Sequence, residues 1–160
     1  MALHKTKIDI AEDKRQELIA ILNQSLADAA DLKSQAKQAH WNVKGPSFIA
    51  LHELFDRVAT EVDVYVDDLA ERITTLSGTA MGTVRLAAAN SSLSEYPHEI
   101  TDGTAHVDAL SSALADFAKK ARTDIDRADE VGDKDTADLY TGISRGIDKL
   151  LWFVEAHIQA

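Results

Sequence analysis

Two pairs of side chains that could bind a metal ion lie on one predicted helix of the 160-residue chain. His52 and Asp56 are four residues apart, and so are Asp67 and Glu71. Residues four apart lie one above the other on the same face of an α-helix, so each pair could chelate a metal ion. Imidazole and carboxylate ligands suit iron, zinc or manganese, and Fe(II) is a natural fit. Polar pairs with this spacing are also common on solvated helix faces.

The spacing between the two pairs limits how they can act together. Asp56 precedes Asp67 by eleven residues, which is a rise of roughly 16 Å along a helix. The ligands of one ion must converge within a few ångströms, so the two pairs of one chain cannot bind the same ion. Either the pairs are unrelated, or this helix packs antiparallel against its own copy across a two-fold axis near residues 61–62. Such an isologous dimer would create two identical sites.

A third imidazole, that of His40, is expected near the same place. His40 ends the preceding predicted helix, and a short link that contains Gly45 and Pro46 separates it from the helix of His52. It could be a further metal ligand. Alternatively, it could interact with the free carbonyl groups at the end of its own helix.

A metal centre inside one bundle is the competing arrangement. Di-iron bundles of that kind use Glu-x-x-His motifs on their helices. The chain has one such match, Glu95-x-x-His98, which contains Pro97 and lies in a long link between helices. An intrachain centre is therefore disfavoured, and a site that uses the residues above would belong to an interface.

These residues lie on long apolar stripes with helical spacing. Apolar residues three or four apart run over about 10–40, 48–76, 107–128 and 140–158. Asp9 and Glu12 have the spacing of a capping box at the start of the first stripe. Four helices of similar length predict an all-α four-helix bundle over residues 10–160, after a short N-terminal tail over residues 1–9.

The links between the helices indicate their order in space. The first and third links have only about five residues, and the third contains Gly132-Asp133-Lys134-Asp135, whereas the second runs from Ser77 to Asp102. A link of that length can cross the whole bundle and leave the second and third helices parallel, as in ferritin-like folds with one long crossover. Within it, Leu93–Tyr96 could form a short helical turn.

Composition excludes several classes of protein. Hydrophobic residues make up 45% of the chain and charged residues 28%, which is typical of a globular domain and not of a disordered chain. The longest apolar run, Leu150–Val154, is too short to span a membrane, and the polar N-terminus is not a secretory signal, so we expect a cytoplasmic protein. The absence of cysteine excludes disulfides and thiolate metal sites. A formal charge of −10 favours cations over nucleic acid.

Several short motifs occur together between about residue 10 and residue 158. They are His40-Trp41-Asn42-Val43-Lys44-Gly45-Pro46, Phe48, Leu51-His52, Leu54-Phe55-Asp56, Asp67-x-x-x-Glu71-Arg72, Thr136-Ala-Asp138 and Asp148-Lys149-x-x-Trp152-Phe153-x-Glu155. In this combination the chain resembles the Dps family, the DNA-binding proteins from starved cells. The resemblance covers almost the whole chain.

The resemblance implies a miniferritin, which is a ferritin-like four-helix bundle with a small helix in the long link, assembled as a hollow dodecamer. It implies oxidation of Fe(II), usually by hydrogen peroxide, and storage of ferric mineral. The family's ferroxidase ligands, which would bind two ferrous ions per site, correspond to His40, His52 and Asp56 of one chain and Asp67 and Glu71 of its two-fold partner. Zinc would compete for the same ligands. Trp41 would lie near the iron, where it could shape the pocket or intercept oxidising equivalents.

An acidic stretch could guide iron into such a cage. It comprises Asp124, Asp126, Asp129, Glu130, Asp133 and Asp135. A ring of these carboxylates around a three-fold axis would raise the local concentration of cations. The alternative is a solvated helix face, because Arg122, Arg127 and Lys134 are interspersed among them.

DNA binding in the resembled family generally depends on flexible basic tails. Here the N-terminal cations Lys5, Lys7, Lys14 and Arg15 are offset by Asp9, Glu12 and Asp13, and no basic extension follows Ile158. We therefore expect weak or absent DNA binding. A nucleoid-compacting protein with little ferroxidase activity is the alternative function, and a helical scaffold with an inactive metal site is a third.

Overall fold

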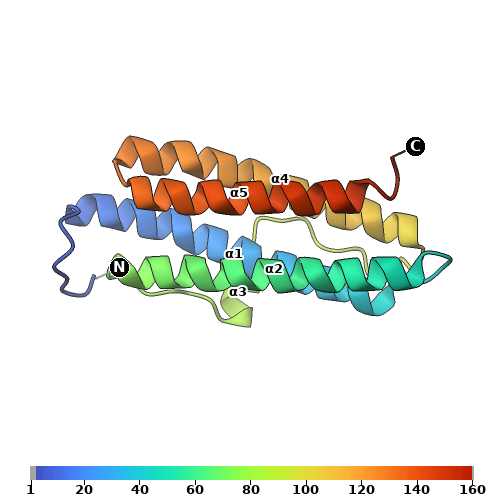
Figure 1. Cartoon of the computed structure of the whole chain (residues 1–160). Coiled ribbons are helices and arrows are strands. Elements are labelled where there is room, and N and C mark those ends of the chain that lie inside the picture. The colour runs from blue at the N-terminus through green and yellow to red at the C-terminus, as the bar shows by residue number, and fades with distance from the viewer. Residues whose placement is uncertain (1–2, 160) are drawn as a thin grey trace.

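A computed structural model describes residues 3–159, which form an elongated bundle of α-helices (Figure 1). The helices are α1 (Glu12–Asn42), α2 (Phe48–Thr75), α3 (Val84–Asn90), α4 (Gly103–Val131) and α5 (Lys134–Glu155). Within the described residues no strand is present, and the one β-bridge joins Lys44 to Asp102. The predicted all-α class is confirmed.

The four long helices form two antiparallel pairs. Helix α1 packs on α2 and α4 packs on α5, each pair across a short link. The long crossover between α2 and α4 runs back along the bundle, so that these two helices point in the same direction (Figure 1). The parallel arrangement predicted from the length of this link is therefore confirmed.

The apolar stripes of the four long helices meet in one core. Its fully buried side chains include Leu18, Leu22, Leu26, Phe55, Leu69, Leu110, Leu114, Ile143, Ile147 and Leu150. Their spacing of three to four residues keeps each stripe on the inner face of its helix. Burial of each large side chain contributes roughly 1.5–3 kcal/mol, which makes this core the main source of stability.

The short helix of the crossover lies at α3, and the prediction of a helical turn over Leu93–Tyr96 was wrong. Helix α3 begins after Thr83, whose hydroxyl accepts a hydrogen bond from the amide of Leu86, and it contains three alanines, which have the highest helix propensity. Residues 93–96 instead precede Pro97, which disfavours helical geometry in the residue before it. Leu93 and Tyr96 pack against the core from a loop.

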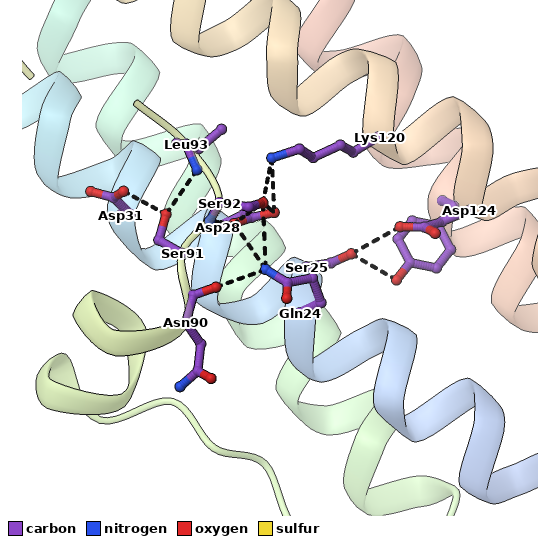
Figure 2. A network of polar contacts seen from close by, with 11 residues as sticks. Gln24, Ser25, Asp28, Asp31, Asn90, Ser91, Ser92, Leu93, Lys120 and Asp124 are labelled. Atoms are coloured by element: carbon purple, nitrogen blue, oxygen red, sulfur yellow. Dashed lines mark hydrogen bonds and ion pairs between the residues drawn. The ribbon is translucent and has the colours of Figure 1, made fainter. Parts of the chain in front are cut away.

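A polar network fixes this loop to the bundle (Figure 2). The buried carboxylate of Asp28 on α1 accepts hydrogen bonds from the amide of Ser92 at 2.6 Å and from its hydroxyl at 2.9 Å. Lys120 on α4 lies 3.5 Å from the same carboxylate. The side-chain amide of Gln24 donates hydrogen bonds to the carboxylate of Asp28 and to the backbone carbonyl of Asn90, the last residue of α3. These contacts determine where the crossover passes over α1.

The helix ends differ from two details of the prediction. Helix α1 begins after Ala11 without a side-chain cap, so the predicted capping box of Asp9 and Glu12 does not form. The link between α4 and α5 is shorter than predicted, because α5 begins at Lys134, directly after the capping residue Asp133. Gly132 ends α4 in a left-handed conformation with φ of 93°, and this conformation favours glycine at the position.

Arg15 has a structural role at the N-terminal end of the bundle. Its side chain is buried, and it donates hydrogen bonds to the carbonyls of Ile10, at 3.0 Å, and Leu76, at 3.2 Å, and to the hydroxyl of Ser77. The positive charge lies against the C-terminal end of α2, where the helix dipole favours a cation. The amide of His4 also donates to the carbonyl of Ser77. Arg15 is therefore not part of a free basic tail.

Two glycines of α5 provide a matched test of packing between helices. A methyl group at Gly146 would overlap the hydroxyl group of Tyr65 on α2, whereas one at Gly142 would meet no atom within 4 Å. We expect Gly146→Ala to lower the free energy of unfolding by about 1–3 kcal/mol. We expect Gly142→Ala to raise it by about 0.5–1 kcal/mol, because alanine favours the helix.

Urea denaturation of the purified variants would measure both effects. Adding Tyr65→Phe should restore part of the stability lost in Gly146→Ala, since it removes the overlapping hydroxyl. Equal stability of the two alanine variants would show that α2 and α5 do not pack as described.

Candidate metal centre

The imidazoles of His40 on α1 and His52 on α2 form a reciprocal pair. Their rings stack with 3.8 Å between centroids and an angle of 23° between planes. Nδ1 of His40 lies 2.8 Å from the carbonyl oxygen of His52, and Nδ1 of His52 lies 2.8 Å from the carbonyl oxygen of His40. A carbonyl oxygen only accepts, so each Nδ1 carries the proton and donates it. In the neutral rings both Nε2 atoms therefore keep the lone pair that a metal ion needs.

The link between α1 and α2 makes this pairing possible. It turns the chain within residues 43–47, where Gly45 has a φ of 109°, a left-handed conformation that favours glycine. The amide of Lys44 donates to the carbonyl of Thr101, which ties the link to the end of the crossover. Val43 and Leu51 are buried on either side of the turn. The end of α1 and the start of α2 are thereby held side by side.

Asp56 lies one turn beyond His52 and is paired with Lys37 of α1. The ammonium group of Lys37 is 2.6 Å from the carboxylate of Asp56. This hydrogen bond lowers the pKa of Asp56, and the nearby imidazoles of His40 and His52 lower it further. The carboxylate therefore remains ionised in mild acid, but one of its oxygens is bound to an internal cation.

The sequence pattern did not point to Lys37. It precedes His40 by three residues, so both side chains lie on one face of α1, and this spacing is the signal that could have found it. Its pairing with Asp56 depends on how α1 is rotated against α2, which the sequence pattern does not state. A metal ion bound by Asp56 would have to compete with this ammonium group.

Asp67 and Glu71 lie apart from the histidines, farther along α2. Both are exposed, and among residues 3–159 neither carboxylate has a hydrogen bond or an ion pair. In this part of the chain no three histidine, aspartate or glutamate side chains form a group that could hold a metal ion. One protomer thus pairs His40 with His52, places Asp56 one turn farther along α2 against Lys37, and leaves Asp67 and Glu71 elsewhere. A site that uses all five residues requires a second chain.

Trp41 lies on the surface next to this group. Its side chain is 66% exposed, and the ammonium of Lys37 lies 5.7 Å from the centre of its ring. Ile49 and Val64 on α2 are also more than half exposed. Exposed apolar side chains of this size on α1 and α2 are typical of a surface that another protein covers.

Two of the six acidic residues considered for an iron-entry pore are used inside the protomer. Asp124 is buried and accepts hydrogen bonds from Ser25 and Arg127, and burial raises its pKa. Asp133 is also buried, and Arg72 binds both of its oxygens, at 2.9 and 2.7 Å. Burial opposes the ionised form of Asp133, but hydrogen bonds from Thr136 and Arg72 lower its pKa overall.

These two carboxylates are therefore unavailable to a pore, and the expectation is wrong for them. The other four acidic residues are exposed and remain candidates: Asp126, Asp129, Glu130 and Asp135.

In the described part of the chain, no helix is both long and apolar enough to cross a membrane.

Comparison with known proteins identifies the family. The profile of the ferritin-like domain family matches residues 19–160. The DNA protection during starvation protein (Dps) of Agrobacterium fabrum is 46% identical over 159 residues, which cover 99% of this chain and 98% of that protein. The chain belongs to the Dps family of ferritin-like proteins.

Solved Dps structures have the same fold. DpsA14 from Streptomyces coelicolor matches with a TM-score of 0.93 and 34% identity, over 99% of this chain and 94% of that chain. A Dps protein from Vibrio cholerae O1, described as a member of a superfamily of ferritin-like diiron-carboxylate proteins, matches with a TM-score of 0.90 and 27% identity, over 99% of both chains. The fold class and the family predicted from the motifs are confirmed.

The ion pair between Lys37 and Asp56 leads to a prediction about cation affinity. Lys37→Gln removes the internal cation, so we expect Zn²⁺ or Fe²⁺ to bind this Dps-family protein more tightly by about tenfold, equivalent to about 1.4 kcal/mol. Lys33→Gln is the matched control, because Lys33 makes a similar α1–α2 pair with Asp63, at 2.5 Å, away from the histidines.

Anaerobic calorimetric titration would compare the two variants with the unaltered protein. Equal affinity in all three would mean that Lys37 does not compete with the metal. Weaker binding in Lys37→Gln would show that the lysine supports the site.

Proposed function

We propose that this Dps-family protein oxidises Fe(II), with hydrogen peroxide as the preferred oxidant, and stores the ferric product as mineral inside a dodecameric cage. The observation that carries the proposal is the reciprocal pair of His40 and His52. Because both Nδ1 atoms donate to carbonyl groups, both Nε2 atoms are available to ferrous iron without a change of tautomer. Asp56 adds a carboxylate oxygen beside them.

The other ligands would come from a two-fold partner. If two α2 helices pack antiparallel about residues 61–62, Asp67 and Glu71 of one subunit approach His52 and Asp56 of the other. The exposed apolar side chains of Trp41, on α1, and Val64, on α2, support a covered interface in this region. The exposure of Asp67 and Glu71 in the single protomer also fits ligands that are completed by a second chain.

The chemistry would need two ferrous ions as substrates at each interface site. Each gives up one electron, and hydrogen peroxide accepts both electrons with two protons to form two water molecules. Transfer of both electrons at one site limits the release of hydroxyl radical. Three carboxylates near one another repel until a cation arrives, which favours metal uptake. Zinc would occupy the same ligands without being oxidised.

Iron would reach the inside of the cage through acidic openings. The four exposed carboxylates near the α4–α5 link, Asp126, Asp129, Glu130 and Asp135, are the candidates to focus cations at a three-fold axis. Asp124 and Asp133 would not contribute, because both are buried and bound within the protomer, whereas Asp129 is exposed although it pairs with Lys134.

Complementation between two variants tests the proposed two-chain site. Asp67→Ala/Glu71→Ala and His40→Ala/His52→Ala should each abolish rapid Fe(II) oxidation after a stoichiometric pulse of peroxide under anaerobic conditions. Co-expressed at equal levels, the two chains should recover about one quarter of the activity. Half of the dimers are mixed at random, and each mixed dimer has one complete site out of two.

The absorbance of ferric iron measures the rate, and Asp68→Ala is the matched control on α2. No recovery in co-assembled particles would contradict a site shared between chains. An unaltered protein that assembles but oxidises iron no faster than buffer would overturn the proposed function.

DNA compaction is the alternative function, and the structure removes part of its basis. Arg15, one of the four N-terminal cations, is buried against the end of α2. The chain also carries a formal charge of −10, which opposes contact with phosphate. We expect no retardation of plasmid in a gel-shift assay at moderate salt and neutral pH. Retardation that weakens steeply with added salt would instead support a DNA-binding role.

A further inference from the structure

A buried tyrosine–histidine pair packs against Phe55, the residue that precedes Asp56 on α2. The hydroxyl oxygen of Tyr96 is 2.7 Å from Nδ1 of His106, and the two side chains are only 5% and 1% exposed. Tyr96 belongs to the crossover and His106 to the first turn of α4, and their rings stack with 6.0 Å between centroids. Neither residue belongs to the proposed set of iron ligands.

Burial keeps the proton on the phenol at rest. It lowers the pKa of His106, although carbonyl groups of Ile100 and Asn42 and the charge of Asp102 act in the opposite direction. Nε2 is buried and has no hydrogen-bond partner within residues 3–159. Burial also raises the pKa of Tyr96, so at rest the pair consists of a neutral phenol and a neutral imidazole.

A short packed path connects this pair to the candidate iron ligands. The ring of His106 packs against that of Phe55, with 6.4 Å between centroids. Phe55 is the residue before Asp56 on α2 and lies three residues after His52, and Asn42 lies two residues after His40. An electron can cross this layer of packed side chains, although a molecule the size of peroxide cannot enter it.

We infer that Tyr96, with His106 as its proton acceptor, is an internal one-electron donor that reduces hydroxyl radical formed at the metal centre. This inference rests on the proposed function. When a single ferrous ion reacts with peroxide, it yields ferric iron, hydroxide and hydroxyl radical. Tyr96 supplies one electron to the radical, which becomes hydroxide, and the phenolic proton moves to Nδ1 of His106. The products on the protein are a neutral phenoxyl radical and an imidazolium.

A second ferrous ion completes the cycle. Its electron reduces the phenoxyl radical while the imidazolium returns the proton, so tyrosine and neutral histidine are restored and the ion becomes ferric. The net result is reduction of hydroxyl radical to hydroxide by Fe(II), without damage to the chain. An oxidised phenol is a strong acid, and a base already within hydrogen-bond distance is therefore the feature that makes this step favourable.

The other two tyrosines are natural controls, because neither has an imidazole partner. Tyr140 shares a hydrogen bond with Ser25 at 2.9 Å, and the hydroxyl of Tyr65 has no hydrogen bond among the described residues. Trp41 is exposed and also lacks a base. Tyr96→Phe, Tyr140→Phe and Tyr65→Phe therefore separate the tyrosine with a proton acceptor from those without one.

Freeze-quench electron paramagnetic resonance tests the inference on the assembled protein loaded with Fe(II) and pulsed with peroxide. We expect a phenoxyl signal that disappears in Tyr96→Phe and persists in Tyr140→Phe and Tyr65→Phe. Spin trapping should show a severalfold rise in released hydroxyl radical for Tyr96→Phe alone. His106→Gln can still accept the hydrogen bond but cannot retain a proton, so its phenoxyl signal should be weaker and decay faster.

The outcomes separate this inference from the proposed function. Rapid iron oxidation with no phenoxyl signal, or with a signal that survives in Tyr96→Phe, overturns the inference and leaves the ferroxidase intact. If iron oxidation is no faster than in buffer, the proposed function fails. Photochemical one-electron oxidation of the iron-free protein then tests whether Tyr96 is the internal one-electron donor. A radical on Tyr96 in that experiment supports its role as the donor, and a radical elsewhere overturns it.

Discussion

A long α-helix holds its side chains at a fixed rise, and this constraint determines how the chain can bind metal. His52 and Asp56 lie near the start of α2, and Asp67 and Glu71 lie three turns farther along. No bending of a packed bundle brings them together. Under the proposed function, the metal chemistry of this Dps-family protein would therefore depend on what α1 supplies at one end of α2 and on what a second subunit supplies. The bundle, the short α1–α2 link and the exposed apolar surface are all compatible with that proposed arrangement.

Most of the fold follows from local patterns in the sequence. The apolar spacing around Leu18 and Leu110 predicted two of the long helices, and the length of the crossover predicted parallel α2 and α4. The errors occurred where tertiary contacts overrode a local signal. Asp9 does not cap α1, because the N-cap position is Ala11, two residues later, and Arg15 binds the carbonyl of Ile10 just before it. The loop at Ser92 is held by hydrogen bonds to the buried carboxylate of Asp28 on α1, and these bonds override any local preference for a helical turn.

The candidate site could be predicted in its residue types but not in its internal contacts. Spacing placed His52 with Asp56 and made His40 a neighbour across a short link. The reciprocal hydrogen bonds to backbone carbonyls and the ammonium of Lys37 depend on the rotation of α1 against α2, which a sequence pattern leaves open. These unpredicted contacts decide which ring nitrogen keeps its lone pair and which cation a metal ion would have to displace.

The carboxylates of the chain fall into two groups with different uses. Three carboxylates, those of Asp28, Asp124 and Asp133, are buried and bind partners from other helices. These contacts stabilise the bundle. Asp67 and Glu71 are exposed and unpaired within the described residues, which leaves their charges uncompensated until a cation or a second chain arrives. Asp56 belongs between these groups, because its partner Lys37 is itself partly exposed and can leave. The negative charge that is available to a bound cation is therefore the part that the fold does not use.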